Sequence, residues 1–336
     1  MWKSLSLTLL RQSHLCTQTR NIQCKAQQIK HRSIIQVSGA DVSQFLQGLM
    51  TNDIRHLEED PNKSMYCMFL NTQGRILYDT IIYNGHEKES YLIECDTNCS
   101  STLIKHLMMY RVRRKISVTL NESLKTWIFF DQPQESFCDG AIVSEDPRTS
   151  ELKWRVVAHP GQIQESNIEI TSEDEYTKLR YQLGIGEGVA DLLPGKSFPL
   201  ECNCDYLHGV SFHKGCYLGQ ELTARTHHTG VIRKRLMPLK FEKPVTINTG
   251  ESELIIRNEK GRKVGKLHGI VPGSTYGLAL MRVQESLSSS YLEIDSNIVS
   301  THRPAWWPIE APKERSHLEK DDWFDYCFCV KNCWFV

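Results

Sequence analysis

The pattern of apolar residues changes once along this chain of 336 residues, near Met237. Before that point, short strand-like runs alternate with amphipathic helical segments, and after it only short strands separated by glycine turns remain. Mixed strands and helices followed by strands alone are typical of an α+β fold with a β-rich module. We therefore predict an α+β N-terminal region over residues 29–236 and a small antiparallel β-barrel over residues 237–310.

The spacing of apolar side chains predicts where the individual elements lie. Helices are expected from Asp41 to Leu49, around Leu103 to Met108, and up to Gly184 after a capping box formed by Ser172 and Glu175. Strands of the N-terminal region are expected at 33–37, 65–70, 76–83, 91–95, 115–120, 127–130 and 154–158. Strands of the barrel are expected at 245–247, 253–257, 263–268, 277–283 and 291–294.

The charge distribution along the chain indicates the cellular compartment of the protein. The first acidic residue is Asp41, and the segment before it is rich in Ser, Thr and Gln and carries the cations Lys3, Arg11, Arg20, Lys25, Lys30 and Arg32. A basic, hydroxyl-rich and acid-free start is typical of a mitochondrial transit peptide, which we place at residues 1–28, with the matrix as destination. The whole chain balances 40 Lys and Arg against 40 Asp and Glu, which argues against a nucleic-acid binder. No run approaches the roughly 18 apolar residues that cross a bilayer.

The octapeptide 214–221, Lys-Gly-Cys-Tyr-Leu-Gly-Gln-Glu, is the strongest functional signal. It places the thiol of Cys216 beside a cation, and a nearby cation lowers the pKa of a thiol and favours the reactive thiolate. The glycines allow a sharp turn or a close approach to a ligand. The other members are Lys214, Gly215, Tyr217, Gly219, Gln220 and Glu221, of which Tyr217 could stack on a planar ligand or pack in the core.

Three roles for Cys216 follow from its neighbourhood. It could be a nucleophile with His213 as base, although no third catalytic group is visible. It could join Cys202, Cys204, His208 and His213 in a zinc site, but the spacing lacks the usual paired cysteines, and we expect no stable zinc. It could be one ligand of an iron–sulfur cluster shared with a second protein, because a cluster normally needs four thiolates.

Four segments resemble the glycine-cleavage T-protein superfamily, and most closely its folate-binding YgfZ branch. They are residues 35–53, 70–79, 180–188 and above all the octapeptide, and the motif Arg-Pro-Ala-Trp-Trp-Pro at 303–308 extends the similarity. The resemblance implies a fold of three subdomains, two of them interleaved in residues 29–236, around an opening that accepts a tetrahydrofolate-type ligand. On this resemblance the ligand would meet Asn71, Asp79, Arg180 and Glu187.

The resemblance also implies a function. Mitochondrial members of the branch assist late iron–sulfur cluster assembly with A-type scaffold proteins, whose clusters serve four-iron proteins such as aconitase and radical-SAM enzymes. The alternative is a tetrahydrofolate-dependent one-carbon transferase. Aminomethyltransferases of the superfamily carry two adjacent aspartates where this chain has Tyr78 and Asp79, and a tyrosine with a pKa near 10 does not replace a carboxylate. We therefore expect a maturation factor rather than an enzyme.

The role of Asp79 and that of the C-terminal segment remain open at this stage. Asp79 either orients a pterin or is an ordinary acid on the solvent-facing side of a strand. The C-terminal segment 311–336, with its cysteine-rich end at 325–336, matches nothing in the resemblance, and no function is assigned to it.

Overall fold

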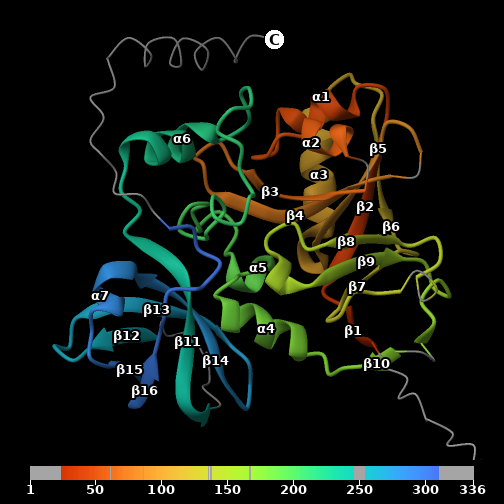
Figure 1. Cartoon of the computed structure of the whole chain (residues 1–336). Coiled ribbons are helices and arrows are strands. Elements are labelled where there is room, and N and C mark those ends of the chain that lie inside the picture. Colours follow the sequence, from red (N-terminus) through yellow and green to blue (C-terminus); the bar gives the residue numbers. More distant parts are fainter. Residues whose placement is uncertain are drawn as a thin grey trace, which may run out of the picture.

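The computed structural model describes residues 24–309 except 61, 86, 135, 137, 166–167 and 246–253. Figure 1 shows two five-stranded sheets on one side of the molecule and a closed barrel on the other. The predicted transit peptide up to residue 23 and the C-terminal tail from residue 310 lie outside the described residues. The α+β architecture with an antiparallel barrel is confirmed.

The first sheet is antiparallel and is covered on one face by three helices. Its strand order is β3 (Ser64–Leu70), β4 (Ile76–Asn84), β5 (Ser90–Asp96), β2 (Arg32–Ser38) and β6 (Ser117–Asn121). The helices are α1 (Val42–Gln47), α2 (Arg55–Glu59) and α3 (Ser100–Arg111), the last preceded by a 3-10 turn at Thr97–Cys99. Phe45, Leu57 and Leu103 pack from these helices onto every second residue of the strands.

The second sheet contains the N-terminal strand as an interior member. Its order is β10 (Ile168–Ile170), β1 (Cys24–Ile29), β7 (Lys125–Phe129), β9 (Trp154–Ala158) and β8 (Ile142–Glu145), with a 3-10 turn at Ser150–Leu152. β1 is parallel to β10 and antiparallel to β7. β1 was not predicted, and it overlaps the last residues of the transit peptide predicted at residues 1–28. Where that peptide ends stays a prediction.

The barrel closes around its own apolar core. Its order is β11 (Lys234–Val245), β14 (Ser274–Arg282), β13 (Lys263–Ile270), β12 (Ile255–Asn258), β15 (Leu292–Ile294) and β16 (Asn297–Ser300), which pairs back to β11. A short helix, α7 (Val283–Leu287), follows β14. The barrel begins at Lys234, before the predicted start at residue 237, and β16 was not predicted.

Three further helices join these units. α4 (Glu175–Leu183) packs against β11 and β14 of the barrel, and α5 (Gly188–Asp191) contacts β4, β5 and β13. α4 ends at Gly184 as predicted, in a left-handed conformation with φ 73°. The predicted capping box at its start is wrong, because Asp174 is the N-cap and its side chain makes no capping bond. α6 (Gln220–Thr229) lies above the barrel in Figure 1.

The uncovered face of the first sheet forms the centre of the molecule. Met68 and Ile81 from that sheet share one apolar cluster with Ile128 of the second sheet, Tyr181 of α4 and Leu278 of the barrel. The three units are thus held by a common core. None of the helices in the described part of the chain combines the length and the hydropathy that a membrane crossing requires.

Candidate functional site: a thiol loop above a buried ion network

Cys216 lies on the loop that leads into α6, and it is the most accessible of the described cysteines. Its side chain is partly exposed, whereas the other described cysteines are buried: Cys24, Cys67, Cys95, Cys99, Cys138, Cys202 and Cys204. Burial raises the pKa of the Cys67 thiol to about 12 and that of Cys204 well above its ordinary value. Among the described thiols, Cys216 is therefore the one that a second protein can reach.

Lys214 anchors the thiol loop to the first sheet. Its ammonium nitrogen donates to the backbone carbonyls of Gln47 at 2.8 Å, Met50 at 2.7 Å and Asn52 at 2.6 Å, all in the segment that joins α1 to α2. Three acceptors use the three donors of an ammonium group. Lys214 is 8% exposed, and this burial lowers the pKa of its ammonium to about 8.

The structure thus gives Lys214 a different task from the one predicted. Its neighbours in the sequence suggested that its charge acts on the Cys216 thiol, yet its protons are directed at carbonyls of another segment. The acidic groups that favour its charged form are Cys67 and Asp53. Lys214 is a structural lysine that fixes the position of the loop.

The second half of the octapeptide is anchored as firmly. The Tyr217 amide donates to Gln220 Oε1 at 3.1 Å, and the Leu218 amide donates to the Gly48 carbonyl at 3.0 Å. Tyr217 is buried in the central core, so core packing rather than ligand stacking is its observed role. Glu221 is exposed in the first turn of α6, where an acidic side chain interacts favourably with the helix dipole.

The two glycines of the octapeptide have unequal surroundings. Gly219 has φ +79°, and a Cβ on it would lie 2.3 Å from the carbonyl oxygen of Asn71. It therefore allows the turn at residues 71–74 to pack directly on the start of α6. Gly215 is exposed and a Cβ on it would meet nothing within 4 Å. Only Gly219 is required by close packing.

The residues considered for zinc do not form a metal site. Cys202 and Cys204 are buried in the central core, whereas His213 is exposed. Nowhere in residues 24–309, as far as they are described, do three His, Cys, Asp or Glu side chains come together as possible metal ligands. A cluster at Cys216 would consequently need ligands from elsewhere.

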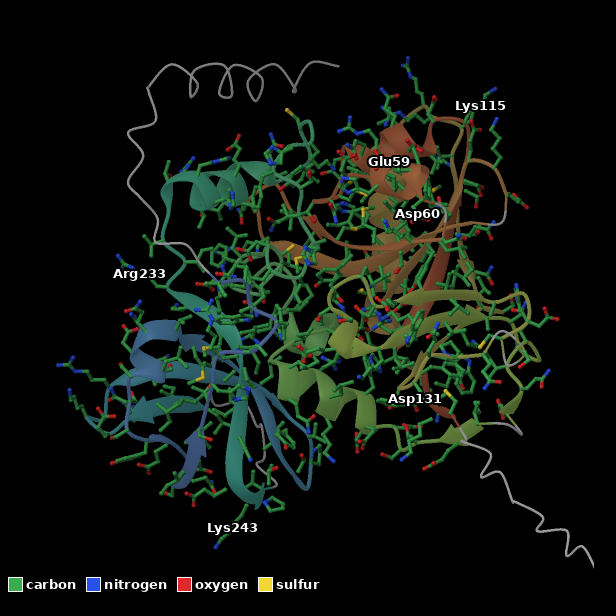
Figure 2. The ribbon with its side chains drawn as sticks, viewed as in Figure 1. Glu59, Asp60, Lys115, Asp131, Arg233 and Lys243 are labelled. Carbon is green, nitrogen blue, oxygen red and sulfur yellow. The ribbon has the colours of Figure 1, made fainter. Side chains whose placement is uncertain are left out.

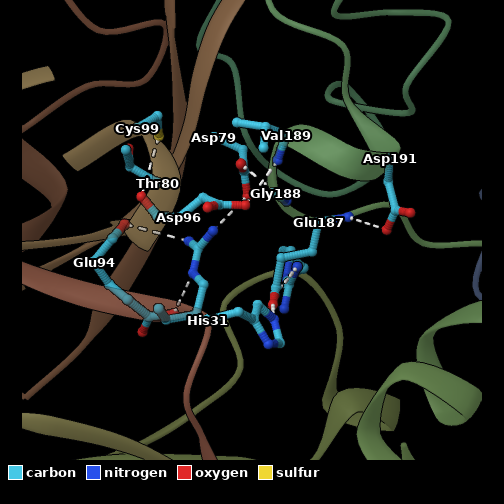
Figure 3. Close-up of polar contacts among 12 residues, drawn as sticks. His31, Asp79, Thr80, Glu94, Asp96, Cys99, Glu187, Gly188, Val189 and Asp191 are labelled. Atoms are coloured by element: carbon cyan, nitrogen blue, oxygen red, sulfur yellow. Dashed lines mark hydrogen bonds and ion pairs between the residues drawn. The ribbon is translucent and has the colours of Figure 1, made fainter. Parts of the chain in front are cut away.

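A buried ion network joins the two sheets, and Figure 3 shows three of its carboxylates, Asp79, Glu94 and Glu187. It consists of three arginines and four carboxylates, all at most 5% exposed: Arg32, Arg148, Arg155, Asp79, Glu94, Asp146 and Glu187. Arg155 contacts Glu94, Asp146 at 2.8 Å and Glu187 at 2.6 Å. Because one guanidinium serves three acids from different elements, the network locks the sheets and the loop before α5 together.

Asp79 and Glu187, two of the predicted folate ligands, belong to this network. Asp79 accepts from Arg32 Nη1 at 3.1 Å and from the Gly188 amide at 3.1 Å, so it is neither solvent-facing nor available. Glu187 contacts Arg148 at 2.9 Å and Arg155 at 2.6 Å. Burial alone would raise the pKa of Glu187, but Arg155 and Arg148 hold it well below its ordinary value.

The other two predicted folate ligands are also engaged within the protein. Arg180 donates to Asp191 Oδ2 at 2.6 Å and to the Ile185 carbonyl at 3.2 Å. Asn71 Oδ1 accepts from the backbone amides of Gln73 and Arg75 and so forms its own turn. Arg180 Nε is the one buried polar atom of these two side chains left without a hydrogen-bond partner.

These contacts test whether a pterin fits the four residues. Both oxygens of Asp79 and both oxygens of Glu187 already have partners, because Glu187 Oε2 contacts the two arginines and Oε1 lies 3.4 Å from His31 Nε2. A pterin would have to displace an arginine or a backbone amide from a buried carboxylate, which costs several kcal/mol. The four residues do not fit a tetrahydrofolate-type ligand in this arrangement.

Five residues of the network were not predicted as functional or structural centres: Arg32, Glu94, Asp146, Arg148 and Arg155. Glu94 and Arg155 interrupt otherwise apolar strands, and an isolated charge in an interior strand is a signal for a buried pair. Such a charge indicates that the residue has a buried partner, but it does not identify that partner.

Tyr78, beside Asp79, turns to the opposite face of the sheet. Its ring lies edge-on to that of His106 of α3, with the ring centroids 5.7 Å apart.

Comparisons with known proteins agree with this architecture. Residues 233–309 match the family of the CAF17 C-terminal β-barrel domain. The mitochondrial iron–sulfur cluster assembly factor IBA57 of Mus musculus is 38% identical over 306 residues, 83% of this chain and 84% of the relative. The protein of the same name from Homo sapiens is 36% identical over 299 residues, 82% of this chain and 83% of the relative.

Among solved structures, the glycine cleavage system aminomethyltransferase T from Bartonella henselae superposes with a TM-score of 0.67. The match covers 84% of this chain and 86% of that protein, at 13% sequence identity. An identity this low shows a common fold and nothing about shared chemistry.

Proposed function

The chain belongs to the IBA57 family of mitochondrial iron–sulfur cluster assembly factors, and we propose that Cys216 is the residue through which it handles a cluster. In this proposal the thiolate of Cys216 is one ligand of a cluster whose remaining ligands come from a partner. The observation that supports it is the accessibility of this thiol on an anchored loop, while the other described thiols are buried.

The names of its relatives place them in mitochondria and in iron–sulfur cluster assembly, and that assembly role implies iron–sulfur proteins as partners of this chain. We propose the matrix as its compartment and A-type scaffold proteins as its partners. The basic, acid-free start of the sequence supports import into the matrix. The resulting four-iron clusters would serve enzymes such as aconitase and radical-SAM proteins.

The chemistry of the proposed step is a ligand exchange. The Cys216 thiol gives up its proton, and the thiolate replaces one cysteine thiolate of the partner on an iron of its two-iron cluster; the displaced thiolate takes up a proton in turn. Because one thiolate cannot hold a cluster alone, the cluster stays shared between the two proteins. Formation of a four-iron cluster then requires a second two-iron cluster and two electrons from a separate reductant. Anchoring by Lys214 and Gln220 keeps the thiol in one place, so little loop entropy is lost when the bridge forms.

A folate-dependent one-carbon transferase is not favoured. Tyr78 stands where such enzymes carry an acid, and Asp79 and Glu187 are engaged by arginines. A carboxylate needs a free oxygen to orient a pterin or to accept a proton from it.

The test is reconstitution with a purified A-type scaffold loaded with a two-iron cluster. Wild-type protein is expected to form a complex with it and to change the visible circular dichroism of the cluster. Cys216→Ser should remove that change while leaving the unfolding temperature unaltered. The matched control is Cys99→Ser, because Cys99 is buried and donates to the Asp96 carbonyl, a bond that a hydroxyl can keep. An unchanged spectrum with wild type, or an identical change with Cys216→Ser, would refute the proposal.

A further inference from the structure

A cavity of about 450 Å³ lies between α6, the segment 198–201 and the first residues of β11. It is separate from the residues discussed so far, since neither Cys216 nor any member of the buried ion network lines it. Cavities of this size accommodate small organic molecules.

The wall of the cavity has an apolar part and a cationic part. Phe198, Leu222, Val231 and Ile232 provide the apolar surface, and Val231 is 74% exposed although it is a large aliphatic residue. The cations are Arg233, Lys234 and Arg282, and the one acidic residue of the lining is Glu201. Three cations against one carboxylate make the site electropositive.

Two of these cations are neighbours on adjacent strands of the barrel. Lys234 and Arg282 are directly paired in the antiparallel register of β11 and β14, so their side chains lie on the same face. Like charges directly opposite each other are destabilising. Among the described residues, Arg282 has a long contact of 3.5 Å with the exposed Glu285, and Lys234 interacts with the carboxyl group of Glu201, so the repulsion is partly compensated. An anion placed between the two side chains would relieve it.

A buried hydroxyl also lines the cavity. Thr223 of α6 is 2% exposed, and its Oγ1 has no hydrogen-bond partner among the described residues. A buried hydroxyl without a partner costs on the order of 1–3 kcal/mol. A ligand that brings a polar atom within hydrogen-bond distance of this hydroxyl would remove that cost.

Glu201 is adapted to such a site. Burial raises the pKa of its carboxyl group, whereas Lys234 and Arg75 act in the opposite direction. Its side chain therefore opposes an incoming anion less than an exposed carboxylate would.

From these observations we propose that the cavity binds a small anionic molecule with a flat apolar body. The anionic group, a carboxylate or a phosphate, lies between Lys234 and Arg282, the body rests on Phe198, Leu222 and Ile232, and a polar atom meets the hydroxyl of Thr223. This site is distinct from the proposed cluster site, because no residue of the octapeptide lines the cavity.

The first experiment uses 8-anilinonaphthalene-1-sulfonate as a fluorescent probe on the folded full-length protein. The probe is expected to saturate a single site, and N-phenyl-1-naphthylamine, the same body without the sulfonate, should bind at least tenfold more weakly. Displacement by 1-naphthaleneacetate and by 1-naphthyl phosphate then distinguishes a carboxylate site from a phosphate site. Absence of saturable binding, or equal affinity for the neutral compound, would overturn the proposal.

The second experiment locates the site with variants. Lys234→Gln combined with Arg282→Gln should weaken probe binding about 2- to 30-fold, since each exposed ion pair contributes about 0.2–1 kcal/mol and the two act on one anion. Thr226→Trp, which places an indole in the cavity, should abolish binding. Lys125→Gln, an exposed cation on β7, is the matched control and should bind as wild type does. Unaltered binding in both cavity variants, or an equal loss in the control, contradicts the assignment.

Discussion

The thiol loop and the buried ion network both depend on buried cations, but the cations act on different partners. Lys214 donates to three backbone carbonyls, whereas Arg155 contacts three carboxylates. The first arrangement fixes a segment that ends at an accessible thiol. The second arrangement fills the interior, and both carboxylate oxygens of Asp79 and of Glu187 have partners there.

The thiol loop thus holds an accessible thiol at the surface, whereas the buried ion network stabilises the fold. A superposable aminomethyltransferase indicates that the fold is shared with enzymes, yet the carboxylates in the centre of this chain are used to join its two sheets. The loop before α6 keeps its reactive group at the surface. Variants of the network should therefore lower the free energy of unfolding, whereas variants of Cys216 should impair cluster transfer and leave stability unchanged. Figure 2 shows the side chains that fill the interior between the elements.

The largest effect is expected for Arg155→Met. Removing this guanidinium leaves Glu94, Asp146 and Glu187 with one cation fewer, and an uncompensated buried charge costs about 3–5 kcal/mol. Urea unfolding monitored by far-UV circular dichroism measures it, with Cys216→Ser as the control that should stay within about 0.5 kcal/mol of wild type. A loss below about 1 kcal/mol for Arg155→Met would show that the network is not what holds the sheets together.

The second effect is the acid sensitivity of the network. The pKa values of Asp146 and Glu187 are held below their ordinary values by arginines that outweigh the effect of burial. A carboxyl group whose folded pKa is depressed contributes stability above its unfolded pKa of about 4, and that contribution is lost as pH falls below it. The free energy of unfolding should drop by a few kcal/mol between about pH 5 and 3.

Glu187→Gln tests the origin of that drop. The variant should be less stable than wild type at pH 7, and its decline toward pH 3 should be shallower, because one of the titrating groups is gone. Parallel declines in the two proteins would assign the acid sensitivity to other groups.

Lys214→Met should have an intermediate effect on stability. The change leaves three carbonyls without their donor, at a cost of about 1–3 kcal/mol near neutral pH. The pKa of Lys214 is lowered from 10.5 to about 8, so between these values the native state binds fewer protons than the unfolded chain. The stability of wild type relative to the variant should therefore rise by about 2 kcal/mol between pH 7 and 10.

The same variant distinguishes two roles of Lys214, positioning the thiol loop and acting on the cluster through its charge. If Lys214 only positions the loop, Lys214→Met should weaken the cluster-dependent complex, and addition of a tenfold excess of scaffold should restore the spectrum. Loss of the spectrum at every scaffold concentration would mean that the ammonium acts on the cluster itself.

The smallest effect distinguishes the two glycines of the octapeptide. Gly219→Ala forces a Cβ toward the Asn71 carbonyl at a positive φ and should cost about 1–3 kcal/mol. Gly215→Ala has open space and should change the melting temperature by less than about 2 °C. Equal losses in thermal unfolding for the two variants would contradict the packing of residues 71–74 on α6.

The sequence predicted most elements because their apolar periods are regular, as at Met65–Leu70 and in α3. It failed at β1, where a basic, polar strand resembles a presequence and only its partners β7 and β10 reveal it. Cys216 was identified from its neighbours. The role of Lys214 was not, because the carbonyls it binds lie more than 160 positions away. Likewise, the pairing of Arg155 with Glu94 joins positions 61 apart.

The interior position of β1 has a consequence for the life of the protein in the cell. β1 is hydrogen-bonded on both sides, so proteolytic trimming past Cys24 would open β7 and β10 as two unpaired edges. Newly exposed edges of this kind recruit strands from other chains and lead to aggregation. A chain shortened past Cys24 is therefore expected to aggregate more readily than one that keeps β1.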